Sequence, residues 1–277
     1  MKASHDVKML SSFLLFLDHV VQSHGEAFVN YTGLFYPITS PYYGLYAYAS
    51  PFKQLCNDTS VPGATILSGV YLNGTYVGIG TSGLRYINHN DGAVYFTSSL
   101  PANVQVSGRY AYKEFNVQIT DQWDVKLLLE TKYVSNSKYN QTLSGLPLDT
   151  KTAPAVFLRF KESVNKPFSF GGIDDNSIKI RAVIIADNEF QKIGISNIFK
   201  NLNLSGVNMV TGLPFDARGN YTGLAYNYDN LSFDTTYWPF IRSARLYDVP
   251  QSSEYADITK SMAVCDFELF TAMKHNI

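Results

Sequence analysis

The chain has 277 residues, of which 45% are apolar and 16% charged, with a formal net charge of −1 at pH 7. This length can bury the core of one large domain or of two modest ones. The balanced charge, without a run of Lys or Arg, argues against sequence-specific nucleic-acid binding, and no apolar run reaches the ~18 residues that a membrane span requires.

The uncharged polar residues and 20 tyrosines that replace the missing charge favour contacts with proteins or glycans, because a phenol ring combines apolar area with a polar tip. The two cysteines, Cys56 and Cys265, lie far apart and outside any C-x-x-C spacing. We therefore expect two free, buried thiols, with a single long-range disulfide as the alternative.

Near the N-terminus, apolar residues at helical spacing predict an amphipathic helix from about Asp6, a suitable N-cap, to Gly25, a suitable C-cap. A secretory signal is the alternative for the apolar run Met9–Leu17. That alternative is weaker, because Asp18 and His19 follow at once and no small-residue cleavage motif is present.

The next stretch, Tyr31–Ser50, contains prolines and glycines that argue against a helix or a central strand, so we expect an extended aromatic segment. Two hairpins should follow, one around Asn73-Gly74 and one around Asn90-Asp91-Gly92. Their predicted strands are Thr65–Leu72 with Thr75–Ile79 and Leu84–Asn88 with Ala93–Thr97. Further strands are predicted at Val104–Val106, Tyr110–Tyr112, Phe115–Thr120 and Lys126–Tyr133.

The polar segment 135–152 lacks periodicity and is predicted to be a linker or excursion between a domain at 1–134 and another at 153–277. The second half should contain strands at Ala155–Phe160, Ile178–Ala186, Phe240–Asp248 and Met262–Thr271. Asp187-Asn188 can cap a helix whose apolar stripe includes Phe190, Ile193, Ile195, Ile198, Phe199 and Leu202. Gly206–Tyr237 is expected to be a long loop.

Together these elements predict a β-rich α+β fold. It has an N-terminal amphipathic helix, an antiparallel β-meander or sandwich domain, and a second antiparallel sheet covered by one helix.

The sequence carries no convincing catalytic, cofactor-binding or metal-binding motif. The stretch Gly78–Gly83 lies between predicted strands rather than before a helix, the five histidines lack metal-ligand spacing, and Asp174-Asp175-Asn176 is better explained as a turn. Carboxylate pairs cannot be chosen from sequence spacing. We therefore expect no enzyme activity and assign no catalytic, cofactor or metal residue; aromatic loops at Tyr221–Tyr228 and Tyr237-Trp238 could stack on sugars.

The overall pattern resembles virion structural proteins of tailed bacteriophages. The resemblance is carried by NYTGLFYPITSPYYGLYAYASPFKQL after the helix, by the hairpin block GVYLNGTYVGIG to GAVYFTSSLP, by KEFNVQIT with LLLETKY, and by FGGIDDNSIKIRAVIIADNEFQKIGISNIF. The last segment is similar to the strand-then-helix unit of neck and tail-terminator proteins. The family has no catalytic residues to transfer.

The resemblance implies a neck, head-tail connector or tail-terminator subunit located in the virion. Such a subunit forms a homo-oligomeric ring around the DNA channel and contacts a portal or adaptor protein, or the tail tube or sheath. The alternative is a glycan- or receptor-binding β-rich module, as in a tail fibre, a baseplate or a secreted carbohydrate-binding protein.

Overall fold

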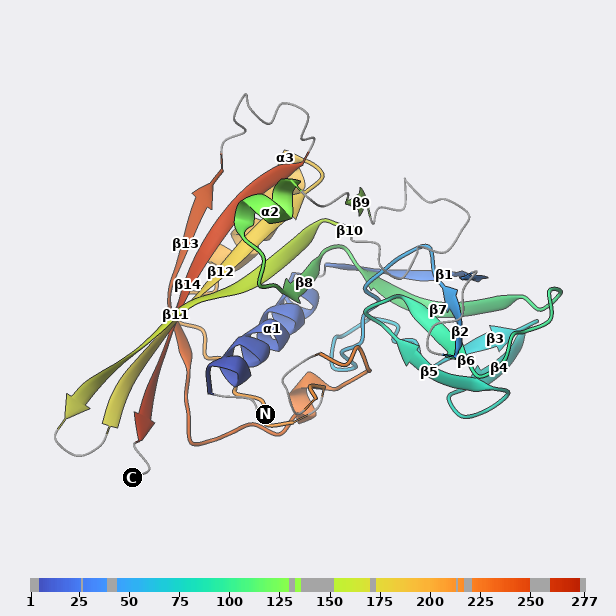
Figure 1. The fold of residues 1–277 in the computed structure, drawn as a ribbon, viewed down its shortest axis with the longest axis horizontal. Helices are drawn as coiled ribbons and strands as arrows, with labels where there is room; N and C mark the ends of the chain where they lie inside the picture. The colour runs from blue at the N-terminus through green and yellow to red at the C-terminus, as the bar shows by residue number, and fades with distance from the viewer. Residues whose placement is uncertain are drawn as a thin grey trace.

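The computed structural model describes residues 5–25, 27–38, 44–129, 133–135, 152–169, 173–212, 214–216, 221–249 and 260–274. It confirms the β-rich α+β class, with two sheets arranged along the long axis of the molecule and an N-terminal helix between them (Figure 1). In the described part, no helix is long and apolar enough to cross a membrane. Cys56 and Cys265 are both buried and free, as expected.

The first sheet has seven antiparallel strands in the order β4-β3-β7-β1-β2-β6-β5. They are β1 (Phe28–Pro37), β2 (Tyr46–Ala49), β3 (Gly69–Leu72), β4 (Thr75–Gly78), β5 (Leu84–Asn88), β6 (Ala93–Phe96) and β7 (Val106–Lys113). The expectation that 31–50 would not supply a central strand was wrong, because β1 lies in the middle of the order. Its proline, Pro37, falls at the strand end, where a missing N–H costs little.

Both predicted hairpins are confirmed. Asn73 and Gly74 have φ values of 48° and 87°, the positive values that a two-residue type I′ turn needs, and Leu72 pairs with Thr75 across it. The second hairpin joins β5 to β6. The sheet encloses its own core, in which Phe35, Tyr110 and Phe96 are buried.

The second sheet has five strands in the order β13-β14-β12-β11-β8. They are β8 (Asn116–Ile119), β11 (Ala155–Ser169), β12 (Ile173–Ala186), β13 (Phe240–Asp248) and β14 (Ser261–Lys274). All pairs are antiparallel except β8 with β11, which is parallel. As predicted, β12 is a central strand buried on both faces, because Ile184 packs in one core and Ile185 in another.

The β11–β12 hairpin is longer than the sequence indicated and projects beyond the helices, which Figure 1 shows at the lower left. Asp174, Asp175 and Asn176 were expected to form a turn, but they pair with Pro167, Lys166 and Asn165 inside this hairpin. Most side chains at this end of the sheet are polar and partly or fully exposed, whereas Asn176 is buried.

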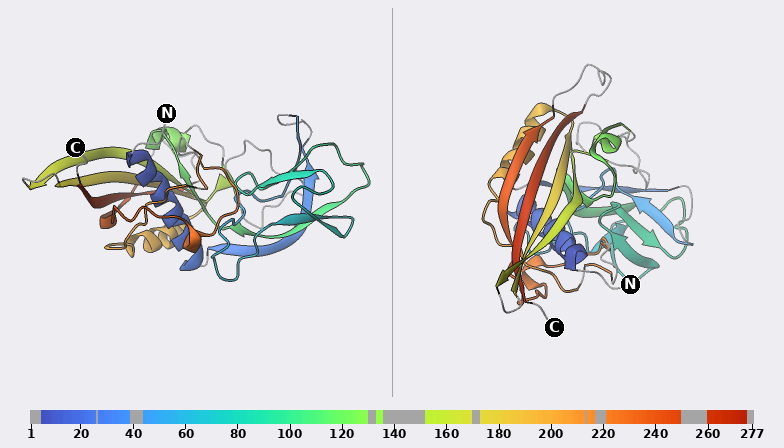
Figure 2. Two further views of the ribbon diagram at one scale, coloured as in Figure 1. Left: turned by 90° about the horizontal axis from the view of Figure 1, so that it is seen from below. Right: turned by 60° about the vertical axis from the view of Figure 1, so that its left-hand side comes forward.

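Two helices, α1 (His5–Ser23) and α3 (Glu189–Lys200), contribute to the core on one face of the second sheet, so the expected cover of one helix is corrected to two. The views in Figure 2 show this layering. The short helix α2 (Asp124–Leu129) covers part of the other face. A strand was predicted over Lys126–Tyr133, but this range is helical up to Leu129, because Leu127 donates its backbone N–H to Trp123 and buries its side chain against the sheet; 130–132 lie outside the described residues.

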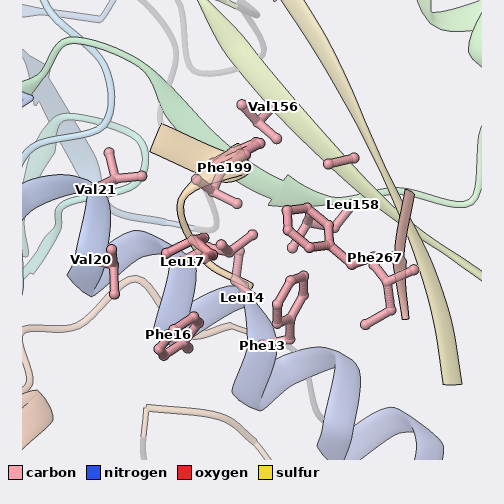
Figure 3. Close-up of a cluster of buried hydrophobic side chains, with 14 of the residues drawn as sticks. Phe13, Leu14, Phe16, Leu17, Val20, Val21, Val156, Leu158, Phe199 and Phe267 are labelled. Atoms are coloured by element: carbon pink, nitrogen blue, oxygen red, sulfur yellow. The ribbon is translucent and has the colours of Figure 1, made fainter. Parts of the chain in front are cut away.

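The core beneath α1 is built from aromatic and aliphatic side chains of α1, α3 and the second sheet (Figure 3). Phe13 of α1 and Phe199 of α3 both meet Phe267 of β14 edge to face, with ring centroids 5.0 Å and 5.6 Å apart. Such edge-to-face pairs stabilise the core beyond what the burial of their apolar area alone contributes.

The helix α1 is not amphipathic in its surroundings, contrary to expectation, since the polar residues Ser12, Asp18 and Gln22 are buried as well. Ser12 Oγ donates to the carbonyl of Lys8 and accepts from the N–H of Val210. Described parts of the segment 206–237, which includes the short 3₁₀ helix η2 (Tyr228–Asn230), therefore lie against the polar side of α1 through Val210 and Tyr226.

The two sheets do not divide the chain at 135–152. The helix α1, the strand β8 and the helix α2 come from the range 1–134 expected for the first domain, yet they pack with the second sheet. The ends of the expected linker pair as two short parallel strands, β9 (Val134–Ser135) and β10 (Thr152–Ala153). Residues 136–151 lie outside the described residues.

We predict that Phe13→Ala lowers the free energy of unfolding by about 3–5 kcal/mol, because it leaves a cavity between two packed layers. Val7→Ala on the same helix, where Val7 is 38% exposed, should change it by less than about 0.5 kcal/mol. Urea denaturation of both variants measures the difference. Equal losses of unfolding free energy in the two variants would show that α1 does not hold this core together.

Candidate functional site

A buried ion pair joins α1 to the first sheet. Lys113, the last residue of β7, places its Nζ 2.7 Å and 2.8 Å from the two carboxylate oxygens of Asp18, and the Tyr226 hydroxyl donates to Asp18 Oδ2 at 3.2 Å. Burial alone would lower the pKa of Lys113, but the adjacent Asp18 carboxylate outweighs it and the pKa is raised. The lysine therefore stays charged inside the protein.

A second polar pair lies beside the first. His19 Nδ1 is 2.8 Å from Asp58 Oδ2, and the imidazole stacks on Tyr228 at 4.3 Å. Burial would raise the pKa of Asp58, but hydrogen bonds from His19, Ser60 and the backbone of Tyr228 hold it below its usual value. His19 therefore belongs to the polar contacts that join α1 to the segment around Asp58.

This second pair is not arranged for nucleophilic catalysis. The hydroxyl of Ser60 donates to Asp58 Oδ1 at 2.6 Å, so it contacts the carboxylate rather than the imidazole. A nucleophile needs a direct contact with its base. Within the described ranges, no group of three His, Cys, Asp or Glu side chains could hold a metal ion.

The tyrosines proposed as sugar platforms are not available for stacking. Tyr226 and Tyr228 are each only 7% exposed, and Tyr221 accepts a hydrogen bond from Asn57. They pack between α1 and the first sheet. Of the second candidate pair, Trp238 is 77% exposed and could contact a ligand.

His89, which directly follows β5, is buried. Its Nε2 lies 3.0 Å from the carbonyl oxygen of Leu67 and its Nδ1 3.2 Å from that of Gly223. Burial lowers its pKa from 6.5 to about 4, although both carbonyl contacts oppose the shift. The side chain joins two loops that are distant in sequence.

An open groove of about 550 Å³ lies where β8 ends beside β11. Its walls are Leu10, Ile119, Thr120, Asp121, Trp123, Arg159, Phe160 and Lys161. The Trp123 ring stands 4.7 Å from the Arg159 guanidinium, which also lies 3.3 Å from Asp124. This cation–π contact holds the indole in place although 72% of the side chain is exposed.

Exposed apolar side chains gather around this groove. Ile119 is 40% exposed, Phe160 37% and Val7 38%, and Val7 lies one turn before Leu10 on α1. We call Val7, Ile119, Trp123 and Phe160 the groove patch. Clustering of this kind marks contact surfaces better than scattered apolar residues do.

The edge of β11 beside the groove is protected from pairing with strands of other chains. In the described residues, β8 pairs with β11 only at Ala155–Leu158. Beyond Leu158, no described strand pairs with this edge of β11. Register shifts at Phe160/Glu162 and Pro167/Ser169, together with exposed Lys161 and Lys166, are common edge protections. The edge therefore offers apolar side chains rather than a regular row of backbone groups.

A second apolar surface lies on α3, toward the β13 edge of the same sheet. The predicted stripe is only half buried: Ile195, Phe199 and Leu202 are in the core, whereas Phe190 is 88% and Ile193 48% exposed. We call Phe190 and Ile193 the α3 patch. Lys192 fixes this turn of the helix by binding Glu189 at 2.7 Å and Asp248 of β13 at 2.6 Å.

No protein-family model matches this sequence, and no curated protein is similar enough to count as a relative.

We predict that Lys113→Ala lowers the free energy of unfolding by about 3–5 kcal/mol, because Asp18 would remain as an unpaired buried charge. The double variant Asp18→Leu/Lys113→Met should lose much less than the sum of its single variants. Chemical denaturation of the four proteins tests this. Additive losses would mean that the two side chains are not coupled.

We predict that acid weakens the fold through His89. The unfolded chain takes up a proton near pH 6.5, whereas the folded protein does so only near its pKa of about 4. Stability should therefore fall as the pH is lowered from 6.5 to 4, by on the order of 3 kcal/mol from this residue. His89→Gln, which cannot titrate, should show a flatter stability profile over that range; identical slopes would exclude the effect.

Proposed function

We propose that the chain is a structural subunit of a tailed-phage virion, of the neck, connector or tail-terminator kind, and that it assembles into a ring around the DNA channel. The observation that carries the ring is the placement of two different apolar surfaces, the groove patch and the α3 patch, toward opposite edges of one sheet. Head-to-tail contacts between unlike surfaces close into rings when the rotation between neighbours allows it. The sequence resemblance supports the assignment to a phage.

The sheet face opposite α1 and α3 supports a place beside DNA. Arg181 pairs with Asp266 at 2.6 Å and with Asp124 at 2.9 Å, Lys179 pairs with Glu162 at 2.5 Å, and Arg242 lies 3.7 Å from Glu268. These cations already have carboxylate partners, so their net attraction for phosphates is small. Such a face would let DNA pass without holding it.

The alternative is a glycan- or receptor-binding module, and Trp123 is the observation that favours it. An exposed, fixed indole beside Thr120, Asp121 and Lys161 offers an aromatic platform with hydrogen-bonding groups around it, the combination that a sugar ring requires. In this alternative the groove holds a glycan.

We predict that mass photometry and negative-stain imaging over a concentration series detect one closed oligomer of uniform diameter. A strict monomer at every concentration would contradict self-assembly. A sugar panel read by tryptophan fluorescence then tests the alternative. A sugar-induced change that disappears in Trp123→Ala and persists in Trp238→Ala would assign glycan binding to the groove.

A further inference from the structure

We propose that neighbouring subunits join by inserting Phe190 of one copy into the groove beside Trp123 of the next. This inference rests on the proposed ring and names the contact that builds it. It concerns a second copy of this chain as the occupant of the groove.

The exposed apolar residues of the α3 patch suit a contact with another molecule. The buried face of α3 consists of Lys192, Ile195, Ser196 and Phe199, so the helix buries a lysine and a serine while it exposes Phe190 and Ile193. A helix packed only against its own sheet would be expected to turn its largest apolar side chains inward. The exposed pair is better placed for a contact outside the chain.

Phe190 is held on a fixed turn and not on a frayed end. Asn188 caps the helix by accepting the N–H of Gln191 at 3.0 Å, and Lys192 ties the same turn to β13 through Asp248. With its backbone fixed and few rotatable side-chain bonds, Phe190 loses little conformational freedom when it is buried, which makes it an effective anchor.

The groove has the size and lining to receive such an anchor. Its volume of about 550 Å³ falls in the range of protein binding pockets, roughly 300–1,000 Å³. Leu10, Ile119 and Phe160 supply apolar walls, and the fixed Trp123 ring offers an aromatic partner.

Charge favours one orientation of the contact. Glu189 precedes Phe190 and keeps its side chain 59% exposed although it binds Lys192, while the exposed Lys161 lines the groove. Asp121 also lines the groove and would repel Glu189. A helix that enters with Glu189 toward Lys161 and away from Asp121 is therefore favoured.

Disulfide trapping tests the contact directly. Phe190→Cys and Ile119→Cys are made in separate chains, in which Cys56 and Cys265 remain buried. The two variants are mixed dilute, concentrated and mildly oxidised. We expect a linked dimer only in the mixture, and a ladder of linked chains from the double variant.

Each other outcome is decisive. A linked dimer from Ile119→Cys alone would show groove-to-groove contact and overturn the proposal. A ring that forms without cross-links would overturn this contact and leave the ring in place, whereas a chain that stays monomeric would overturn both. Leu204→Cys, at a residue 77% exposed outside both patches, is the matched control and should not link to Ile119→Cys.

A substitution without cross-linking gives a second measure. Phe190→Asp should raise the dissociation constant of self-association by about 30-fold or more, since it removes a central aromatic anchor. Leu204→Asp should leave it unchanged. The urea unfolding transition of both variants should match the wild type, because neither side chain belongs to the core. Unchanged assembly of Phe190→Asp would overturn the proposal.

Discussion

The structure depends on the burial of most of α1, whose polar residues Ser12, Asp18 and Gln22 are enclosed together with its apolar ones. One side of the helix completes the core of the second sheet through Phe13 and Leu17, while the other places Asp18 against Lys113 at the end of the first sheet. A buried ion pair adds little net stability compared with apolar packing, but breaking one partner is costly. The pair therefore fixes how the helix is rotated, and this rotation sets the position of one sheet relative to the other.

The shape of the groove depends on the same helix. Leu10 lies at the groove wall and Phe13, one turn later, lies in the core, so a rotation of α1 would move both together. The other walls come from the end of β8, from the residue before α2 and from β11. Because β8 and β11 are strands of the second sheet and Trp123 contacts Arg159 of β11, the groove is a preformed feature and not a loop that must be ordered by a partner.

Local signals in the sequence were sufficient where the backbone conformation is local. Asn73-Gly74 specified a turn because few residues tolerate positive φ, and Asn188 specified a helix start because its side chain satisfies an otherwise free N–H. Long-range packing overrode the other patterns. The polar residues of α1 were predicted to face solvent because nothing in their spacing reveals Lys113 or Val210, and α2 was missed because a short apolar run fits strand and helix alike.

The error on α3 bears most directly on function. Periodicity placed Phe190 and Ile193 in the core because an apolar stripe on a helix is normally buried against its own domain. In the folded chain Lys192 is buried instead, because Glu189 and Asp248 hold it. The two apolar side chains remain exposed. The exposed Phe190 and Ile193 are the side chains that the proposed contact between copies would cover, so the departure of burial from the sequence pattern is the feature on which that proposal rests.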